Sequence, residues 1–294
     1  MQMLSTPRPD QTLPTLRPLP DATPRPAQFE CAGRTDVGCV RARNEDQFLV
    51  SRLGRWMSID ASSIDSAPRE LWTPQGQLMV VADGMGGQGA GDVASAVVLD
   101  TFVSHSLLEM PWLTTGTVEG DALLARDLTA TLAHCQDRLV EVAARKDLPP
   151  RLGTTFTALY LESGRAVVAH VGDTRAYRLR EGHLERLTRD HTLAADLEAL
   201  GHPPAHHNVL TNAVGGTSEK PIVDLRSVDV APGDRFLLSS DGLHGVVDEA
   251  TIERLVRGAA SAREGVDVLI HAAREAGAPD NVTAVVAFVR PART

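Results

Sequence analysis

The sequence predicts an α+β fold in which two packed sheets each carry a pair of helices on the outside. Strand-like and helix-like segments are grouped along the chain and do not alternate strictly, which argues against a doubly wound parallel sheet. Two pairs of helical segments each have an apolar face, and two sheets packed face to face would cover both. The chain has 294 residues, 43% of them hydrophobic, which is enough for a sizeable core.

The individual elements follow from apolar patterns and from turn residues. Strands are predicted where apolar residues run or alternate between turns, and helices where they recur at every third or fourth position. The predicted strands span 29–37, 46–53, 77–82, 154–161, 166–171, 176–179, 222–228, 235–240 and 282–289. The predicted helices span 92–108, 121–146, 192–200, 249–257 and 262–276.

Turn-forming residues set the limits of several of these elements. Residues 54–76 are rich in Ser, Asp, Gly and Pro and are expected to form a loop or hairpin insertion. Five glycines between 84 and 91 predict a tight turn with an exposed backbone. Pro149 and Pro150 stop the second helix, and Gly201 ends the third.

The first 27 residues differ in composition from the rest. They hold seven of the eighteen prolines, so we expect a disordered tail over 1–27 and one domain over 28–294. No run of about 18 apolar residues and no apolar signal-peptide core is present, so neither a transmembrane helix nor export is expected. The three cysteines lack metal or disulfide spacing, which indicates a reducing cytoplasm.

The net charge of −9 bears on the choice of partner. Binding to a phosphate backbone needs clustered Lys and Arg, and no basic stripe is present, so nucleic acid is not expected as a partner. An acidic surface suits divalent cations, although it is also ordinary for soluble proteins.

Aspartates follow apolar strand-like runs at widely separated places in the chain, at Asp83, Asp173, Asp241 and near Asp280. A buried carboxylate is costly unless something positive lies beside it. Several carboxylates delivered to one place by strand ends therefore predict a hard divalent cation, and the absence of neighbouring Cys or His favours Mg²⁺ or Mn²⁺. A single Asp-Gly is usually only a turn, so the repetition makes the prediction.

Further residues fit the same chemistry. Glu45 and Asp46 add two acids, and the carbonyl of Gly84 can approach a cation closely because glycine has no side chain. This number of acids suits two or three ions. Two ions about 3.5–4 Å apart can bridge a hydroxide and stabilise displacement at phosphorus. Arg41 could grip a phosphate with two hydrogen bonds, or it could be an ordinary solvated arginine.

Together these segments resemble the metal-dependent protein phosphatases of the protein phosphatase 2C type. The resemblance covers 29–289, and the Asp-Gly-Met-Gly-Gly segment is similar to bacterial members. It rests on seven segments in the family's order, at 41–46, 82–87, 153–155, 171–175, 208–216, 238–242 and 280–281.

The resemblance implies a four-layer α-β-β-α sandwich of two antiparallel sheets with a binuclear metal centre. It implies hydrolysis of phosphoserine and phosphothreonine in proteins by a metal-bound water, with Arg41 holding the substrate phosphate. The expected partners are phosphorylated proteins, plausibly including a cognate Ser/Thr kinase. The resemblance also implies a monomer, and the sequence shows no heptad pattern that would indicate otherwise.

The resemblance also assigns roles to the acidic residues. Asp83 would bridge two core Mg²⁺ or Mn²⁺ ions, and Gly84 would give its carbonyl to one of them. Asp241 and Asp280 would complete the other ion, and Asp173 would bind a third, weaker ion with help from Asp241. The full set of implied ligands, direct or through water, is Glu45, Asp46, Asp83, Gly84, Asp173, Asp241 and Asp280.

The chain departs from the family pattern at the general acid. Animal members have a histidine where Met85 stands, and many bacterial members have one where Gln88 stands. That histidine is thought to protonate the leaving group. The general acid is therefore expected to be metal-bound water or a histidine from elsewhere.

The flap, at about 192–216, looks short and contains a group of histidines. A histidine-bound metal is one interpretation, but Pro203-Pro204 breaks the helical spacing that it would need. A mobile, solvated flap with pH-sensitive charge is favoured. The histidines are His202, His206 and His207, with His191 just before the flap.

Two other functions compete with an active phosphatase. One is a pseudophosphatase that binds phosphoproteins without cleaving them; the retained Asp83, Asp241 and Asp280 argue against it. The other is a different two-metal hydrolase such as a nuclease, which the negative charge and the lack of a basic groove disfavour.

Overall fold

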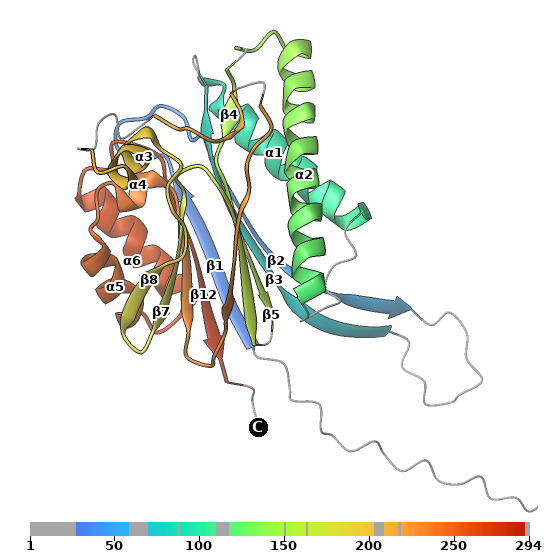
Figure 1. Ribbon diagram of the computed structural model, residues 1–294. Helices are drawn as coiled ribbons and strands as arrows, with labels where there is room; N and C mark the ends of the chain where they lie inside the picture. Colours follow the sequence, from blue (N-terminus) through green and yellow to red (C-terminus); the bar gives the residue numbers. More distant parts are fainter. Residues whose placement is uncertain are drawn as a thin grey trace, which may run out of the picture.

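The computed structural model describes residues 28–58, 70–86, 89–109, 118–149, 151–162, 164–202, 209–216 and 219–291. Two antiparallel sheets pack face to face with helices on both outer sides (Figure 1). This arrangement confirms the predicted four-layer sandwich. The predicted tail over 1–27 lies outside the described residues, as do Gln88, His206 and His207.

All strand pairs within the two sheets are antiparallel. The first sheet has the order β1 (Gln28–Asp36), β12 (Val282–Arg290), β11 (Arg235–Ser239), β7 (Arg175–Arg180) and β8 (His183–Arg186). The second has the order β10 (Asp224–Asp229), β6 (Arg165–Val171), β5 (Phe156–Glu162), β3 (Glu70–Met85), β4 (Gly153–Thr154) and β9 (Val214–Gly215). A further strand, β2 (Asp46–Ser58), pairs with β3.

Two helix pairs cover the outer faces of the sheets. Helices α1 (Gly91–Glu109) and α2 (Val118–Arg145) lie on the second sheet, and α5 (Glu249–Gly258) and α6 (Ala262–Glu275) lie on the first. Two short helices, α3 (Leu193–Ala199) and α4 (Asp241–His244), lie at one end of the sandwich. No described helix is long and apolar enough to cross a membrane.

Hydroxyl and carboxylate side chains cap the later helices. The side chain of Thr192 accepts a hydrogen bond from the N–H of Ala195 at the start of α3. Asp248 and Ser261 do the same for α5 and α6. Each cap satisfies an N–H group that has no partner within the helix, which is why these helices begin where they do.

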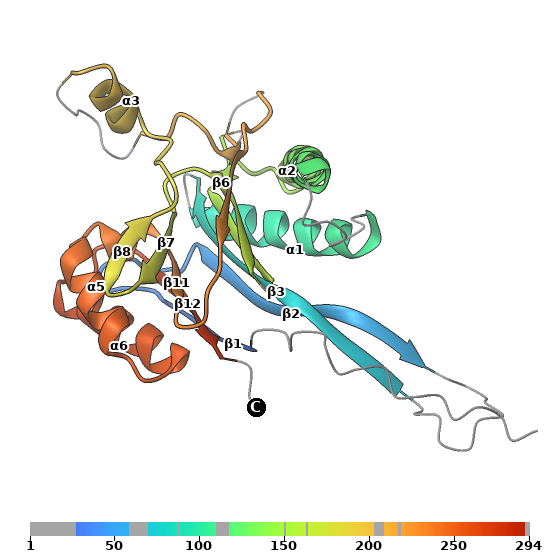
Figure 2. The same cartoon turned by 60° about the horizontal axis from the view of Figure 1, so that its bottom comes forward.

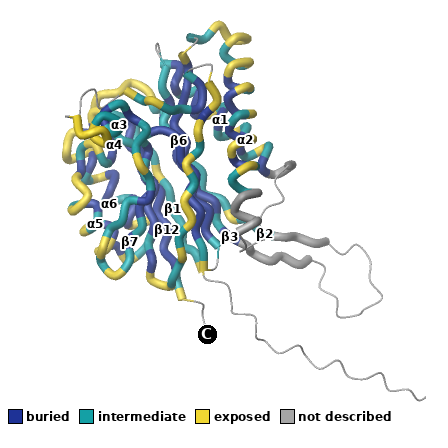
Figure 3. The backbone as a smooth tube through the Cα atoms, in the orientation of Figure 1, coloured by how far each residue is buried: buried dark blue, intermediate teal, exposed yellow. Residues whose placement is uncertain are grey.

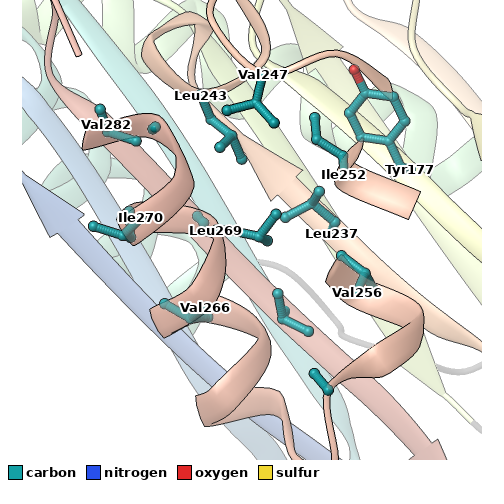
Figure 4. Close-up of a cluster of buried hydrophobic side chains, with 14 of the residues drawn as sticks. Tyr177, Leu237, Leu243, Val247, Ile252, Val256, Val266, Leu269, Ile270 and Val282 are labelled. Carbon is teal, nitrogen blue, oxygen red and sulfur yellow. The ribbon is translucent and has the colours of Figure 1, made fainter. Parts of the chain in front are cut away.

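The alternation of side chains along each strand divides the core into layers. On β3, Leu78 and Val80 pack toward α1 and α2, whereas Met79 and Val81 face the other sheet. Strand β11 behaves in the same way, with Leu237 packing under α5 and α6 (Figure 4). Both faces of the central strands are buried (Figure 3), so they appear in the sequence as continuous apolar runs.

The structure differs from the predicted elements at several places, including the unpredicted α4 and β9. Strands β2 and β3 continue through much of 54–76 as a long hairpin beyond the rest of the sheet (Figure 2), so the hairpin interpretation of this segment is confirmed and the loop interpretation is wrong. Strand β8 was not predicted; it follows a turn at Glu181 and Gly182, both with positive φ. Thr155 divides the strand predicted at 154–161 into β4 and β5.

Truncation in the layer between the sheets is expected to be costly. Phe236 is fully buried there, and replacing it with Ala should lower the free energy of unfolding by about 3–5 kcal/mol because a cavity remains. Urea denaturation of the two proteins measures the difference. Val140→Ala on the exposed surface of α2 is the control and should stay within about 0.5 kcal/mol of the unmodified chain. Equal losses for the two variants would contradict this layered core.

Candidate metal and phosphate site

The acidic residues singled out in the sequence lie at strand ends, at one end of the two sheets. Asp46 opens β2 and is paired directly with Asp83 on β3. Asp173 follows β6, Asp241 begins α4 just after β11, and Asp280 precedes β12. Segments from near both ends of the described chain therefore supply one cluster of acidic residues.

Burial and mutual repulsion both raise the pKa values of these carboxylates. Burial raises the pKa of Asp83 well above its ordinary value, and the charges of Asp46, Asp241, Asp173 and Asp280 raise it further. Burial likewise raises the pKa of Asp241, and the charge of Asp280 raises it further. The carboxylates thus cannot all be ionised without a compensating positive charge.

The pKa values of two other acids in the cluster are also raised. Burial raises the pKa of Asp46 to about 7, although hydrogen bonds from Thr283 and Ser240 oppose the shift. Burial also raises the pKa of Asp173 to about 7, with contributions from the charges of Asp241 and Asp190. Both residues would be fully ionised at this pH in water.

Unsatisfied oxygens indicate what the cluster can bind. Asp46 Oδ1 and Asp241 Oδ1 are buried and have no hydrogen-bond partner among the described residues. Leaving such atoms unpaired is costly, and carboxylate oxygens are the ligands that Mg²⁺ and Mn²⁺ prefer. The donor set therefore fits a hard divalent cation.

The carboxylates of the cluster are not arranged as a ligand set around one point. Among the described residues, no three Asp, Glu, His or Cys side chains form a ready-made metal-binding group. Two of the acids are turned to protein donors, since Asp46 Oδ2 accepts from Ser240 Oγ (2.7 Å) and Thr283 Oγ1 (2.6 Å), and Asp280 Oδ2 accepts from Arg41 (2.7 Å).

Arg41 lies at the edge of this acidic cluster. Its guanidinium forms an ion pair with Asp280 at 2.7 Å, and Glu45 and Asp83 are close enough to raise its pKa further. About half of its side chain, 53%, is exposed. A guanidinium that lies at the edge of a carboxylate cluster and is exposed on one side is suited to binding an anionic group such as a phosphate.

The two Asp-Gly pairs need glycine for packing. A side chain on Gly84 would collide with the carbonyl oxygen of Gly91 at the start of α1, and one on Gly242 would collide with that of Asn281. These contacts bring α1 and the segment before β12 against the cluster. Close approach to a cation was the reason predicted from the sequence; close approach of neighbouring backbone is the reason visible here.

Glu45 is held at the start of helix α1. Its side chain accepts a hydrogen bond from the N–H of Gly91 (3.3 Å), and its carbonyl accepts one from Ser95 Oγ (2.6 Å). The positive end of the helix dipole favours a carboxylate there. Burial nevertheless raises the pKa of Glu45.

Several supporting residues were not recognised as such from the sequence. Asn281 accepts a hydrogen bond from the N–H of Glu45 (2.8 Å) and donates to the carbonyls of Val37 (2.9 Å) and Arg43 (2.8 Å), so it joins the segments on both sides of the site. Ser240 and Thr283 orient Asp46. Their only signal in the sequence is that each lies within three residues of a predicted ligand.

A cavity of about 870 Å³ opens beside Asp173 and Asp241. Helix α3 forms one of its walls, and Arg175 and His244 are among its other lining residues. Arg175 is fixed by Asp190, with its closest contact at 2.7 Å. The carboxylate cluster is thus reached through a cleft between α3 and α4.

His244 is a candidate for the expected general acid, because it lines the cavity beside Asp173 and Asp241. It lines the cavity, and its Nδ1 lies 3.0 Å from Ser239 Oγ. Burial lowers its pKa to about 3, and the charges of Arg175 and Arg186 add to this. His244 is therefore neutral near pH 7 and is a poor proton donor.

His191 departs from the solvated state expected for the flap histidines. Only 14% of its side chain is exposed. Its Nδ1 accepts from the N–H of Gly172 (3.1 Å) and from Asn212 (3.0 Å), and its Nε2 lies 3.1 Å from Asp224. It therefore holds the residue before Asp173 in place, whereas His202 is exposed as expected.

Comparison with known proteins agrees with this geometry. Residues 69–285 match the sequence profile described as "Protein phosphatase 2C". The serine/threonine protein phosphatase PstP of Mycobacterium tuberculosis is 33% identical over 270 residues, which cover 88% of this chain and 44% of PstP. The serine/threonine phosphatase stp of Listeria innocua is 31% identical over 259 residues, covering 85% of this chain and 92% of that protein.

A solved structure provides a third comparison. The catalytic domain of PstP, crystallised in complex with two manganese ions, has a TM-score of 0.69 to this chain at 30% identity. The match covers 90% of this chain and 99% of that domain. This chain therefore spans less than half of full-length PstP and nearly all of its catalytic domain. From its sequence, its fold and the arrangement of its acidic residues, the chain belongs to the protein phosphatase 2C family.

Proposed function

We propose that this protein is a metal-dependent protein serine/threonine phosphatase. The observation that supports this most directly is the cluster of coupled carboxylates, with unpaired buried oxygens and Arg41 at its rim. The relatives named above are serine/threonine phosphatases, and the match extends over nearly the whole folded chain. Phosphorylated proteins are therefore the proposed substrates.

The proposed ligands of Mg²⁺ or Mn²⁺ are those that the sequence indicated. When bound, such ions supply a water of lowered pKa and neutralise charge on the phosphoryl group. The manganese complex of the PstP domain supports this choice of metal. The ligand set is Glu45, Asp46, Asp83, the carbonyl of Gly84, Asp173, Asp241 and Asp280.

Arg41 is the proposed phosphate-binding residue. It lies against Asp280, which is itself a proposed ligand, so a cation on Asp280 would weaken this ion pair. The guanidinium would then be free to form two hydrogen bonds with phosphoryl oxygens. Its half-exposed position allows this movement without disturbing the core.

The pseudophosphatase alternative requires a damaged site, and none of the predicted acids is missing. A nuclease would need cations along a groove, whereas the net charge is −9. We further propose that the protein acts as a monomer in the cytoplasm. Because it would remove phosphate from Ser and Thr, we also propose that it opposes a cognate Ser/Thr kinase.

Removal of a central carboxylate tests the metal site. Asp83→Asn should reduce Mn²⁺-dependent hydrolysis of p-nitrophenyl phosphate by more than about 100-fold, because loss of a ligand costs more than loss of its supporting residue. Asp137→Asn on the exposed surface of α2 is the matched control and should keep normal turnover. Undiminished activity in Asp83→Asn, or activity that survives EDTA, would reject the proposed function.

Arg41 can be tested separately. Arg41→Ala should lower kcat/KM for a phosphothreonine peptide by about 10- to 100-fold, equivalent to the ~1.5–3 kcal/mol of a hydrogen bond to a charged group. Arg34→Ala, which removes a similarly exposed arginine paired with Asp267, should change little. If the two variants behaved alike, Arg41 would not be the phosphate-binding residue.

The raised pKa values predict how metal binding depends on pH. Asp46 and Asp173 have pKa values of about 7, above their ordinary value of about 3.9. Their contribution to the stability of the metal-free protein is present below the ordinary pKa and is lost as pH rises through 7. A cation also competes with fewer protons above pH 7.

The increase in melting temperature caused by Mn²⁺ should therefore be larger at pH 8 than at pH 6. Differential scanning fluorimetry, with EDTA as the reference at each pH, measures it. An equal or larger increase at pH 6 would show that these carboxylates do not bind the ion.

A further inference from the structure

A second, smaller pocket lies along strand β3 from the carboxylate cluster. Its volume is about 360 Å³, and its lining includes Met85, Arg151, Val209, Leu210, Lys220 and Ile222. We refer to the space between these six residues as the flanking pocket. None of them belongs to the proposed metal and phosphate site.

The flanking pocket is close to Asp83 because of the strand register. Met85 comes two residues after Asp83, so both side chains lie on the same face of β3, about 7 Å apart along the strand. Met85 pairs with Gly153 on β4, and Gly153 pairs with Gly215 on β9. The floor of the pocket is thus part of the sheet that holds Asp83.

Hydrogen bonds make this connection rigid. The N–H of Asp83 donates to Thr155 Oγ1 (2.9 Å), and the carbonyl of Asp83 accepts from Thr154 Oγ1 (2.8 Å) and from the N–H of Thr155 (2.9 Å). Met85 Cε lies 3.5 Å from the position that a Cβ on Gly216 would take, so its side chain lies over the β4–β9 backbone. The distance between cluster and pocket is therefore fixed.

The rim of the flanking pocket is unusually apolar for a surface. Val209 and Ile222 are 48% and 72% exposed, and they are two of the five exposed large hydrophobic side chains among the described residues. Single exposed hydrophobics are ordinary, but two around one hollow beside a candidate active site indicate a contact surface. An apolar side chain is the group that this rim would remove from water.

Ile222 is held in position at this rim. Its carbonyl accepts a hydrogen bond from Asn212 Nδ2 (2.6 Å), and its N–H donates to Asn212 Oδ1 (3.2 Å). Asn212 is itself hydrogen-bonded to His191. A rim that is already ordered loses little entropy on binding.

The charge of the lining complements a phosphorylated segment. Arg151 and Lys220 supply two positive charges, against one negative charge from Glu219. This local excess of positive charge is opposite in sign to the net charge of the chain, −9. A phosphopeptide is anionic, so the lining attracts it whereas most of the protein surface does not.

We infer that the flanking pocket binds an apolar side chain of the substrate, one or two residues from the phosphorylated Ser or Thr. An extended peptide advances about 3.3 Å per residue, so a side chain at that separation spans the distance from Asp83 to Met85. The inference rests on the proposed phosphatase function and adds a sequence preference to it.

The test compares phosphothreonine peptides that carry Leu or Ser at each of the two positions before and after the phosphorylated residue. For the unmodified protein with Mn²⁺, Leu in at least one of these positions should raise kcat/KM about 10-fold. The double substitution Val209→Ser with Ile222→Ser should reduce this preference to less than about 2-fold. Turnover of p-nitrophenyl phosphate and of the all-Ser peptide should not change.

Val140→Ser, at an equally exposed site on α2, is the control and should keep the preference. As a second variant, Lys220→Glu should slow hydrolysis of peptides with an added Asp several-fold and leave p-nitrophenyl phosphate turnover unchanged. Absence of a Leu preference, or its persistence in the double variant, would overturn the pocket while leaving the phosphatase assignment intact. Absence of p-nitrophenyl phosphate turnover in the unmodified protein would instead reject the phosphatase function, and the pocket with it.

Discussion

Repulsion between carboxylates is the constraint on which the rest of this structure depends. Asp46, Asp83 and Asp241 are brought together with little positive charge beside them, and burial raises the pKa of each. The surrounding framework resists this repulsion through hydroxyl donors to Asp46 and through the Asn281 side chain, which ties the neighbouring segments together. This repulsion favours binding of a cation at the site. It also lowers the stability of the metal-free protein, and the packing of the core offsets that loss.

The sandwich supplies the stiffness that such a site needs. The layer between the sheets and the layers beneath each helix pair are separate apolar clusters, and the strands that carry the acids run through them. The acids stand at or near the ends of strands, so the core fixes their backbone positions. The core thus fixes the positions of the acids, which are gathered at one end of the sheets.

The layered fold could be predicted from the sequence, and so could the gathering of aspartates at one end of the sheets, because both depend on local patterns. Continuous apolar runs such as 78–82 identify strands buried on both faces, and the aspartates that follow them identify their ends. The sequence left a loop and a hairpin open for 54–76, because the composition of this segment is typical of a loop. The roles of Ser240, Thr283, His191 and His244 were not predictable, since each depends on a partner brought near only by the tertiary fold.

The direct pairing of Asp46 with Asp83 has a consequence for how the molecule matures. Sliding β2 by a single residue along β3 would turn Asp46 to the opposite face of the hairpin, and the apolar side chains of β2 would turn with it. A chain misaligned in this way would lose Asp46 from the carboxylate cluster. Binding of a divalent cation at this cluster would therefore stabilise chains in which β2 and β3 are paired in the native register over chains in which they are not.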